Sequence, residues 1–234
     1  MLRSVVLSMF MASIASGLRA EETVPIDTSW LPMTPEVQTY DMSGKFGEGM
    51  VQVSSLRSAT GIEVQISTIS PGFAKTVIGE MDFNLKPGKS KTRMMIDGKI
   101  SMATDCDYSA DGVRVSTFML PYNQKLERTL KSKEPFVDFA QTLLLIRSLK
   151  LKPNAEFQFT SVNPKNNTLI PTKIHVVAEE TVEKIACYKV QLDDFDGRSS
   201  IWVEKGGAHR IFKTETADGT ITELIPFVMP FPQP

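Results

Sequence analysis

Residues of the types needed for metal binding or nucleophilic chemistry are few and scattered in this chain. The nitrogen and sulfur donors are His175, His209, Cys106 and Cys187, and none of them has the paired Cys-x-x-Cys or His-x-x-x-His spacing of a zinc site. A Gly-x-Ser-x-Gly nucleophile elbow and a phosphate-binding glycine-rich loop are also missing. We therefore predict no metal, no cofactor and no catalytic residues. A hydrolase that uses an unmarked pair of carboxylates is the distant alternative.

The two cysteines allow two interpretations. In an exported protein Cys106 and Cys187 could form a disulfide, which would close a long loop and stabilise the fold by roughly 4 kcal/mol through the unfolded state. Alternatively, both are buried, unpaired thiols that pack as small hydrophobic side chains. The spacing in the sequence does not choose between these interpretations.

Residues 1–20 have the pattern of a secretory signal peptide. Arg3 gives a positive start, residues 5–18 are mostly apolar or small, and cleavage fits after Gly17 or Ala20. The apolar run is short for a hydrocarbon layer of ~30 Å, so we expect no transmembrane anchor after processing. No cysteine lies near the cleavage site, so the sequence does not predict a bacterial lipoprotein. The predicted product is a periplasmic or secreted protein.

Composition limits the classes of partner. Of the 234 residues, 41% are hydrophobic, which is enough for a folded core. The formal net charge of −1 gives no basic surface for nucleic acid, so we predict no nucleic-acid binding.

Alternating apolar and polar residues predict β-strands over most of the chain. Residues 61–67 (GIEVQIS) and 76–85 alternate with period two, which is typical of a sheet with one buried face. Four Asp-Gly pairs lie between such runs and suit two-residue hairpin turns. They occupy residues 97–98, 111–112, 196–197 and 218–219. The sequence therefore predicts an antiparallel meander.

One segment, residues 134–150 (EPFVDFAQTLLLIRSLK), has helical periodicity. We predict a central amphipathic helix at about 135–149, with its apolar face against the sheet. The expected solvent face consists of Glu134, Asp138, Gln141, Thr142 and Ser148. The predicted fold class is mainly β (α+β): a highly curved antiparallel sheet, or half-barrel, around this helix.

Arg147 falls within the apolar face of that helix. Either its stem is buried while its guanidinium reaches water, or it forms a buried ion pair with a strand carboxylate. An unpaired buried charge would cost about 3–5 kcal/mol. The carboxylates considered as partners are Glu80, Asp82, Asp193 and Asp194.

The chain divides into a lead-in, one domain and a tail. Residues 21–45 contain three prolines and predict an extended lead-in, and residues 46–226 form a single antiparallel β domain that includes the helix. The tail, residues 227–234, is rich in proline and cannot enter a sheet interior. It either packs against its own domain or binds a partner as a proline-rich peptide.

A curved sheet around a helix would leave an apolar concavity that suits a lipid or another apolar ligand. The residues that we expect to line this groove are Phe136, Phe139, Leu143, Ile146, Met81 and Phe83.

Four short motifs carry a resemblance to a known family. They are Leu145-Ile146-Arg147, the strand entry from Leu151 to Phe157, the segment Ile201-Trp202-Val203-Glu204, and the hairpin ETADGTITEL. With these motifs, residues 45–226 resemble a family of exported bacterial proteins described as a domain of unknown function (DUF3108-like). Asn154 departs from the glycine usual there, so that turn differs. The family is similar in fold to the half-barrels that carry lipoproteins across the periplasm, which implies an apolar groove.

We expect a periplasmic, non-catalytic binding or carrier protein for a lipid, a lipidated protein or another apolar envelope component. The alternative is an envelope assembly or scaffold protein that acts through contacts with an envelope protein partner, without a small ligand. A hydrolase is the third hypothesis.

Overall fold

The computed structural model describes residues 26–31, 34–44, 47–163 and 166–225. The predicted signal peptide (1–20) and proline-rich tail (227–234) lie outside the described residues. The lead-in is described from Ile26 onward, with a gap at residues 32–33.

The strands of the described residues form one antiparallel sheet of 14 strands, in the order β8-β7-β6-β5-β4-β3-β2-β1-β14-β13-β12-β11-β10-β9. They are β1 (Glu36–Ser43), β2 (Gly49–Arg57), β3 (Ile62–Ser70), β4 (Phe73–Met81), β5 (Pro87–Ile96), β6 (Lys99–Ser109), β7 (Gly112–Met119), β8 (Gln124–Leu130), β9 (Glu156–Asn163), β10 (Thr168–Val182), β11 (Ile185–Asp194), β12 (Gly197–Glu204), β13 (Ile211–Glu215) and β14 (Ile221–Leu224). The predicted fold class is confirmed. One detail is corrected: β1 begins at Glu36, inside the segment expected to be an extended lead-in.

All four Asp-Gly pairs lie at hairpin turns, as the sequence predicted. Asp97 and Gly98 form the complete loop between β5 and β6, with φ of 48° and 74°, the backbone that a two-residue primed turn needs. At the other three pairs the glycine ends the turn or starts the next strand. The hairpins produce two meanders, β1–β8 and β9–β14, and β14 joins them by pairing with β1.

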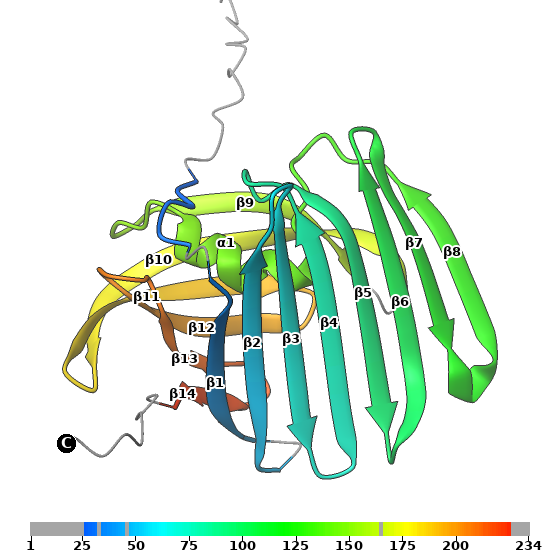
Figure 1. Cartoon of the computed structure of the whole chain (residues 1–234), viewed down its shortest axis with the longest axis horizontal. Helices are drawn as coiled ribbons and strands as arrows, with labels where there is room; N and C mark the ends of the chain where they lie inside the picture. Colours follow the sequence, from blue (N-terminus) through cyan, green and yellow to red (C-terminus); the bar gives the residue numbers. More distant parts are fainter. Residues whose placement is uncertain (1–25, 32–33, 45–46, 164–165, 226–234) are drawn as a thin grey trace, which may run out of the picture.

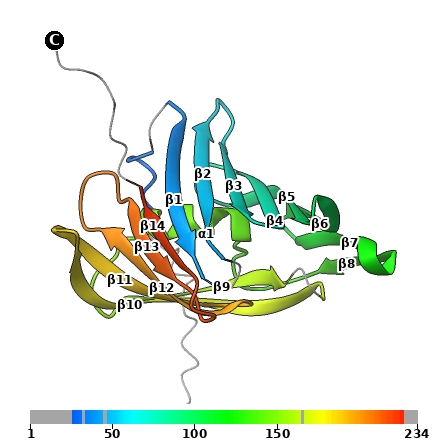
Figure 2. The same cartoon turned by 90° about the horizontal axis from the view of Figure 1, so that it is seen from below.

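The sheet folds over on itself. In Figure 1, strands β2–β8 stand side by side in front, and strands β9–β12 cross behind them. Figure 2 shows the two halves as separate layers with the helix α1 (Thr142–Ser148) between them. Two short 3₁₀ turns, η1 (Leu120–Tyr122) and η2 (Phe139–Gln141), complete the structure. The sheet remains open, because β8 and β9 are its two edges.

The helix begins later than the periodicity predicted, at Phe139 as η2 and at Thr142 as α1. The preceding residues pair with the edge of β9: Val137 donates its N–H to the Thr160 carbonyl, and Thr160 donates its own to the Pro135 carbonyl, each at 2.9 Å. These strand-type hydrogen bonds keep residues 135–137 extended, because a backbone group that is bonded to β9 is not available for a helical hydrogen bond. Asp138 then caps η2 by accepting the Ala140 N–H at 2.8 Å.

The predicted solvent face of the helix is also corrected. Gln141 and Ser148 are each 1% exposed and Thr142 is 8% exposed, because the two layers enclose α1 on both sides. The turn η2 lies close to the sheet at Gly79 of β4, where an added Cβ would lie 2.5 Å from the Ala140 Cβ. The space inside the folded sheet is thus filled by α1 and its neighbours.

Candidate functional site

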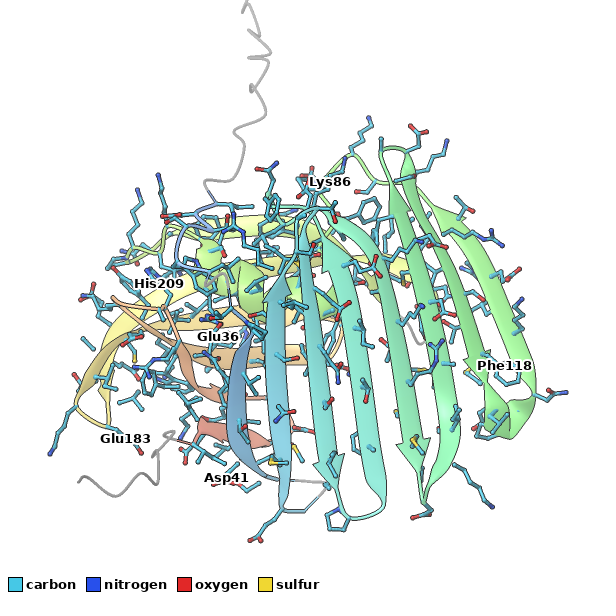
Figure 3. All side chains as sticks on the ribbon, in the orientation of Figure 1. Glu36, Asp41, Lys86, Phe118, Glu183 and His209 are labelled. Atoms are coloured by element: carbon cyan, nitrogen blue, oxygen red, sulfur yellow. The ribbon has the colours of Figure 1, made fainter. Side chains whose placement is uncertain are left out.

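A recess of about 420 Å³ opens at one end of the folded sheet. Its walls come from the β4–β5 connection, the β6–β7 turn and the segment that leads from β8 to η2. Lys86 marks this end of the molecule in Figure 3. Most of the lining surface is apolar, although only half of the lining residues are; the others are neutral polar residues and charged residues that are exposed at the rim. The apolar ones are Ile26, Leu85, Pro87, Ala110, Pro135, Phe136, Leu145 and Phe159, and the charged ones are Lys86, Lys133 and Glu134.

Gln141 contributes a buried polar group to the lining of this recess. Its Nε2 donates to the Leu85 carbonyl at 2.9 Å, which fixes the orientation of the carboxamide. Its Oε1 is buried and has no hydrogen-bond partner in the part of the chain that the structure describes. Such a group is unusual, because 90% or more of buried polar groups in native proteins are hydrogen-bonded.

A buried carboxylate organises the wall beside Gln141. Asp138 is 6% exposed, and its Oδ2 accepts from Ser90 Oγ and Tyr108 Oη, each at 2.6 Å. Burial, with the negative charge of Asp138 as a further cause, raises the pKa of Tyr108 well above its ordinary value. Tyr108 therefore stays a phenol that donates to Asp138, and its ring packs edge-on against Phe136 at 5.8 Å between centroids. This network holds the recess wall in place.

Cys106 and Cys187 are both free and buried, which agrees with the second of the two interpretations, unpaired thiols that pack as small hydrophobic side chains. Cys106 on β6 packs with Val113, Val115 and Val162, whereas Cys187 on β11 lies in register with Glu204 of β12, outside that cluster. Burial, followed by the charge of Asp138, raises the pKa of Cys106 to about 12. A thiol with such a pKa is not a nucleophile at neutral pH.

Arg147 forms a buried ion pair, but with Glu36 rather than with any of the four carboxylates considered. Its Nη1 and Nη2 each reach a Glu36 carboxylate oxygen at 2.9 Å, and the two side chains are 4% and 18% exposed. Nε donates to the His209 carbonyl at 3.0 Å and Nη2 to the Ala208 carbonyl at 2.9 Å. The guanidinium carbon also lies 4.1 Å from the centre of the Trp30 ring. Glu36 and His209 are labelled in Figure 3. Each of the three guanidinium nitrogens donates to a protein group, so we assign Arg147 a structural role.

The predicted ligand groove is not open. Met81 (5% exposed) and Ile146 (0%) are core residues, and Phe83, Phe139 and Leu143 pack against the same core. Of the six predicted residues, only Phe136 lines the recess.

The interior is filled because residues of α1 and η2 occupy the concavity. A cavity between α1 and strands β1–β3 has a volume of about 10 Å³, which is close to the space of one water molecule. The recess at the end of the folded sheet therefore offers a ligand far more space than this interior cavity, and its lining depends on turns and connections.

Sequence analysis missed Tyr108 and placed Gln141 on a solvent face. The available signal was weak: Gln141 is an uncharged polar residue directly before an unbroken apolar run, and Tyr108 ends an alternating strand. Within the described residues, no group of three or more His, Cys, Asp and Glu side chains could hold a metal ion. None of the helices in those residues is long and apolar enough to cross a membrane.

Comparison with known proteins gives a family and a fold. A family model described as "Protein of unknown function (DUF3108)" matches residues 39–225. The chain is also similar to a crystal structure of a beta-barrel-like protein of the domain of unknown function DUF1849 from Brucella abortus, with 12% identity and a TM-score of 0.55. The similarity covers 83% of this chain and 97% of that one, and at this identity it describes the fold alone. No curated protein matches the sequence.

Proposed function

Because the chain belongs to the DUF3108 family, whose description states no activity, we propose a function from the recess: this protein binds or carries an apolar ligand there without transforming it. The observation that carries the proposal is a recess of about 420 Å³ with mainly apolar walls and charged residues at its rim. Ligand sites typically measure about 300–1,000 Å³ and combine apolar lining with a few oriented polar groups. We propose no catalytic step, because the sequence contains no nucleophile elbow or other catalytic motif. The Cys106 thiol offers no nucleophile either, since burial raises its pKa.

The size of the recess limits the ligand. A volume in the lower part of the usual range suits one hydrocarbon chain or a group of similar size, and a lipid with several chains would place one of them there. Lys86 and Lys133 at the rim are exposed and favour an anionic head group that stays in water. The wider groove expected from the fold resemblance does not contribute, since α1 fills it.

We also propose that the protein is periplasmic or secreted, on the pattern of residues 1–20. This proposal is independent of the recess. N-terminal sequencing of the protein recovered from the exported fraction of its host should give a chain that starts after Gly17 or Ala20. Recovery of the complete chain from the cytoplasm would contradict it.

The binding proposal is tested by blocking the recess. Ala110, an exposed residue of the β6–β7 turn, lines the recess, so Ala110→Trp places a large side chain at its mouth. The chain offers a matched control in Ala217→Trp, because both alanines are exposed turn residues that precede Asp-Gly. Native mass spectrometry of protein purified from its host should show a bound small molecule with wild type and Ala217→Trp, and little or none with Ala110→Trp.

Two outcomes would contradict the proposal. One is equal ligand occupancy in both tryptophan variants, which would place the ligand elsewhere. The other is the absence of any bound small molecule from the wild type together with a stable protein partner that Ala110→Trp still binds. The second outcome would support the scaffold hypothesis instead.

A further inference from the structure

We infer that a second hollow, at the end of β14, holds the start of the chain's own proline-rich tail, with Phe227 as the inserted residue. The hollow has a volume of about 260 Å³ and lies between β14 and the hairpin of β10 and β11. Figure 3 labels Glu183 at the turn of that hairpin. This inference is independent of the proposed function of the recess.

A β-bulge in β13 forms one side of the hollow. Trp202 of β12 pairs with Lys213 of β13. The next residue of β12, Val203, pairs with Ile211, so Phe212 is the extra residue between them. A bulged residue is left out of the ladder and its strand bends at that point. Phe212 is thereby free to line the hollow.

The other side of the hollow comes from the separation of β13 and β14. Their pairing ends at Lys213 and Glu223, whereas Leu224, the last residue of β14, still pairs with Tyr40 of β1. The end of β14 therefore follows β1 and leaves β13. The space between the two strands opens at the point where the chain continues toward the tail.

The lining of the hollow combines half-buried apolar side chains with one fixed aromatic ring. Val182, Phe212 and Leu224 are the half-buried ones. Trp202 is 6% exposed, and its Nε1 donates to Glu180 Oε2 at 2.7 Å, which holds the indole in place. The apolar wall is thus formed before a side chain enters, and little ordering is needed on docking.

The charged residues at the hollow favour an uncharged occupant. Lys213 Nζ lies 3.1 Å from a Glu223 carboxylate oxygen, and Lys189 Nζ lies 3.3 Å from one of Glu180. A neutral side chain leaves both pairs intact, whereas a cation would compete with the lysines for their carboxylates. Residues 227–234 carry no charged side chain.

The tail is also within reach of the hollow and suits its size. Phe227 is the third residue after Leu224, so their Cα atoms are at most about 11 Å apart. The hollow is smaller than the about 300 Å³ at which small-molecule sites begin, and one large apolar side chain suits it. The prolines of the tail exclude it from the sheet but restrict its backbone, which lowers the entropy lost on docking.

Disulfide trapping in the full chain tests this inference. Thr181 is exposed and lines the hollow, so Thr181→Cys combined with Val228→Cys should give an intramolecular disulfide under mild oxidation. The matched control combines Val228→Cys with Ala217→Cys, which is exposed at the opposite end of β14. Docking raises the effective concentration of the tail at the hollow, so the first pair should cross-link with about tenfold higher yield. The native cysteines are buried and free, and peptide mapping identifies the cysteines that are joined.

A second comparison tests Phe227 as the anchor. Adding Phe227→Ser should lower the yield of the Thr181→Cys pair toward that of the control pair, whereas Phe231→Ser, the same change further along the tail, should not. Equal yields in the two cysteine pairs, or a yield that Phe227→Ser leaves unchanged, would overturn the inference. A dimer joined through the same two introduced cysteines would also overturn it, because the tail of a second copy would then occupy the hollow.

Discussion

Replacing Arg147 with alanine should lower the free energy of unfolding by about 3 kcal/mol, at the lower end of the about 3–5 kcal/mol lost when one partner of a buried ion pair is removed. The guanidinium is 4% exposed and makes four hydrogen bonds: two to Glu36 and one each to the carbonyls of His209 and Ala208. The lower end applies because Glu36 is 18% exposed and keeps a hydrogen bond from Gln38 Nε2 at 3.1 Å.

Urea unfolding at neutral pH measures this loss, with the slope of the transition checked for two-state behaviour. Arg198→Ala is the matched control, because Arg198 also pairs with a carboxylate, that of Asp193 at 2.8 Å, but its side chain is 67% exposed. Solvent screens that pair, so the control should unfold at nearly the wild-type urea concentration. A loss in Arg147→Ala no larger than that in Arg198→Ala would refute the reasoning.

A double-mutant cycle separates the ion pair from the other contacts of Arg147. Glu36→Gln removes the negative charge and keeps the shape, and Arg147→Ala in that background should cost less than in the wild type. We expect a coupling free energy in the upper part of the range of about 0.5–3 kcal/mol found for residues in contact. Additive losses would mean that the carbonyl and Trp30 contacts, and not the charge of Glu36, hold Arg147.

Three further predictions follow from packing and burial. Both cysteine thiols should resist Ellman's reagent at about pH 8 and react once the protein is unfolded, because burial raises the pKa of Cys106 to about 12 and also raises that of Cys187. Fewer than two reactive thiols in the unfolded protein without a reductant would contradict this. Gly79→Ala should destabilise the protein to urea by about 1–3 kcal/mol through overpacking against Ala140, whereas Gly88→Ala, whose added Cβ has its nearest neighbour at 3.5 Å, should have little effect. Burial raises the pKa of the Asp194 carboxyl, so between the unfolded and the folded pKa the folded state binds more protons than the unfolded state. The free energy of unfolding therefore falls as pH rises through that window. Urea unfolding measured across this pH range should show a smaller fall in Asp194→Asn than in the wild type, and identical profiles would contradict the assignment.

Local signals in the sequence were sufficient for most strands and for the Asp-Gly turns, but not for β1, which lies in the expected lead-in. Alternation fixes which face of a strand is buried, and an Asp-Gly pair selects the tight turn, so both can be read without knowing the rest of the fold. The loop at Asp97 and Gly98, with positive φ at both residues, is the clearest case.

The start of the helix and the position of the ligand site could not be predicted in the same way. Residues 135–137 have helical periodicity, but they are extended because the edge of β9 offers hydrogen bonds that are distant in sequence. Gln141 looked like a solvent-facing residue because the sequence does not show that a second layer covers that side of α1. The Arg147 partner was missed for a related reason: Glu36 lies 111 positions away, in a segment that seemed to precede the domain.

The pairing of β14 with β1 determines the order in which the sheet can be completed. The middle of the chain supplies both edges, β8 and β9, while the first and last strands of the fold meet near the centre of the sheet. During synthesis, one side of β1 therefore has unsatisfied backbone groups until residues 221–224 have emerged, so a nascent chain is exposed to mispairing until then. A stop codon before residue 221 would remove a central join and separate the two meanders, which is more damaging than the loss of an outer strand. By the same logic, a circular permutant that opens the chain between β8 and η2 would make β14 and β1, the central neighbours, continuous in sequence.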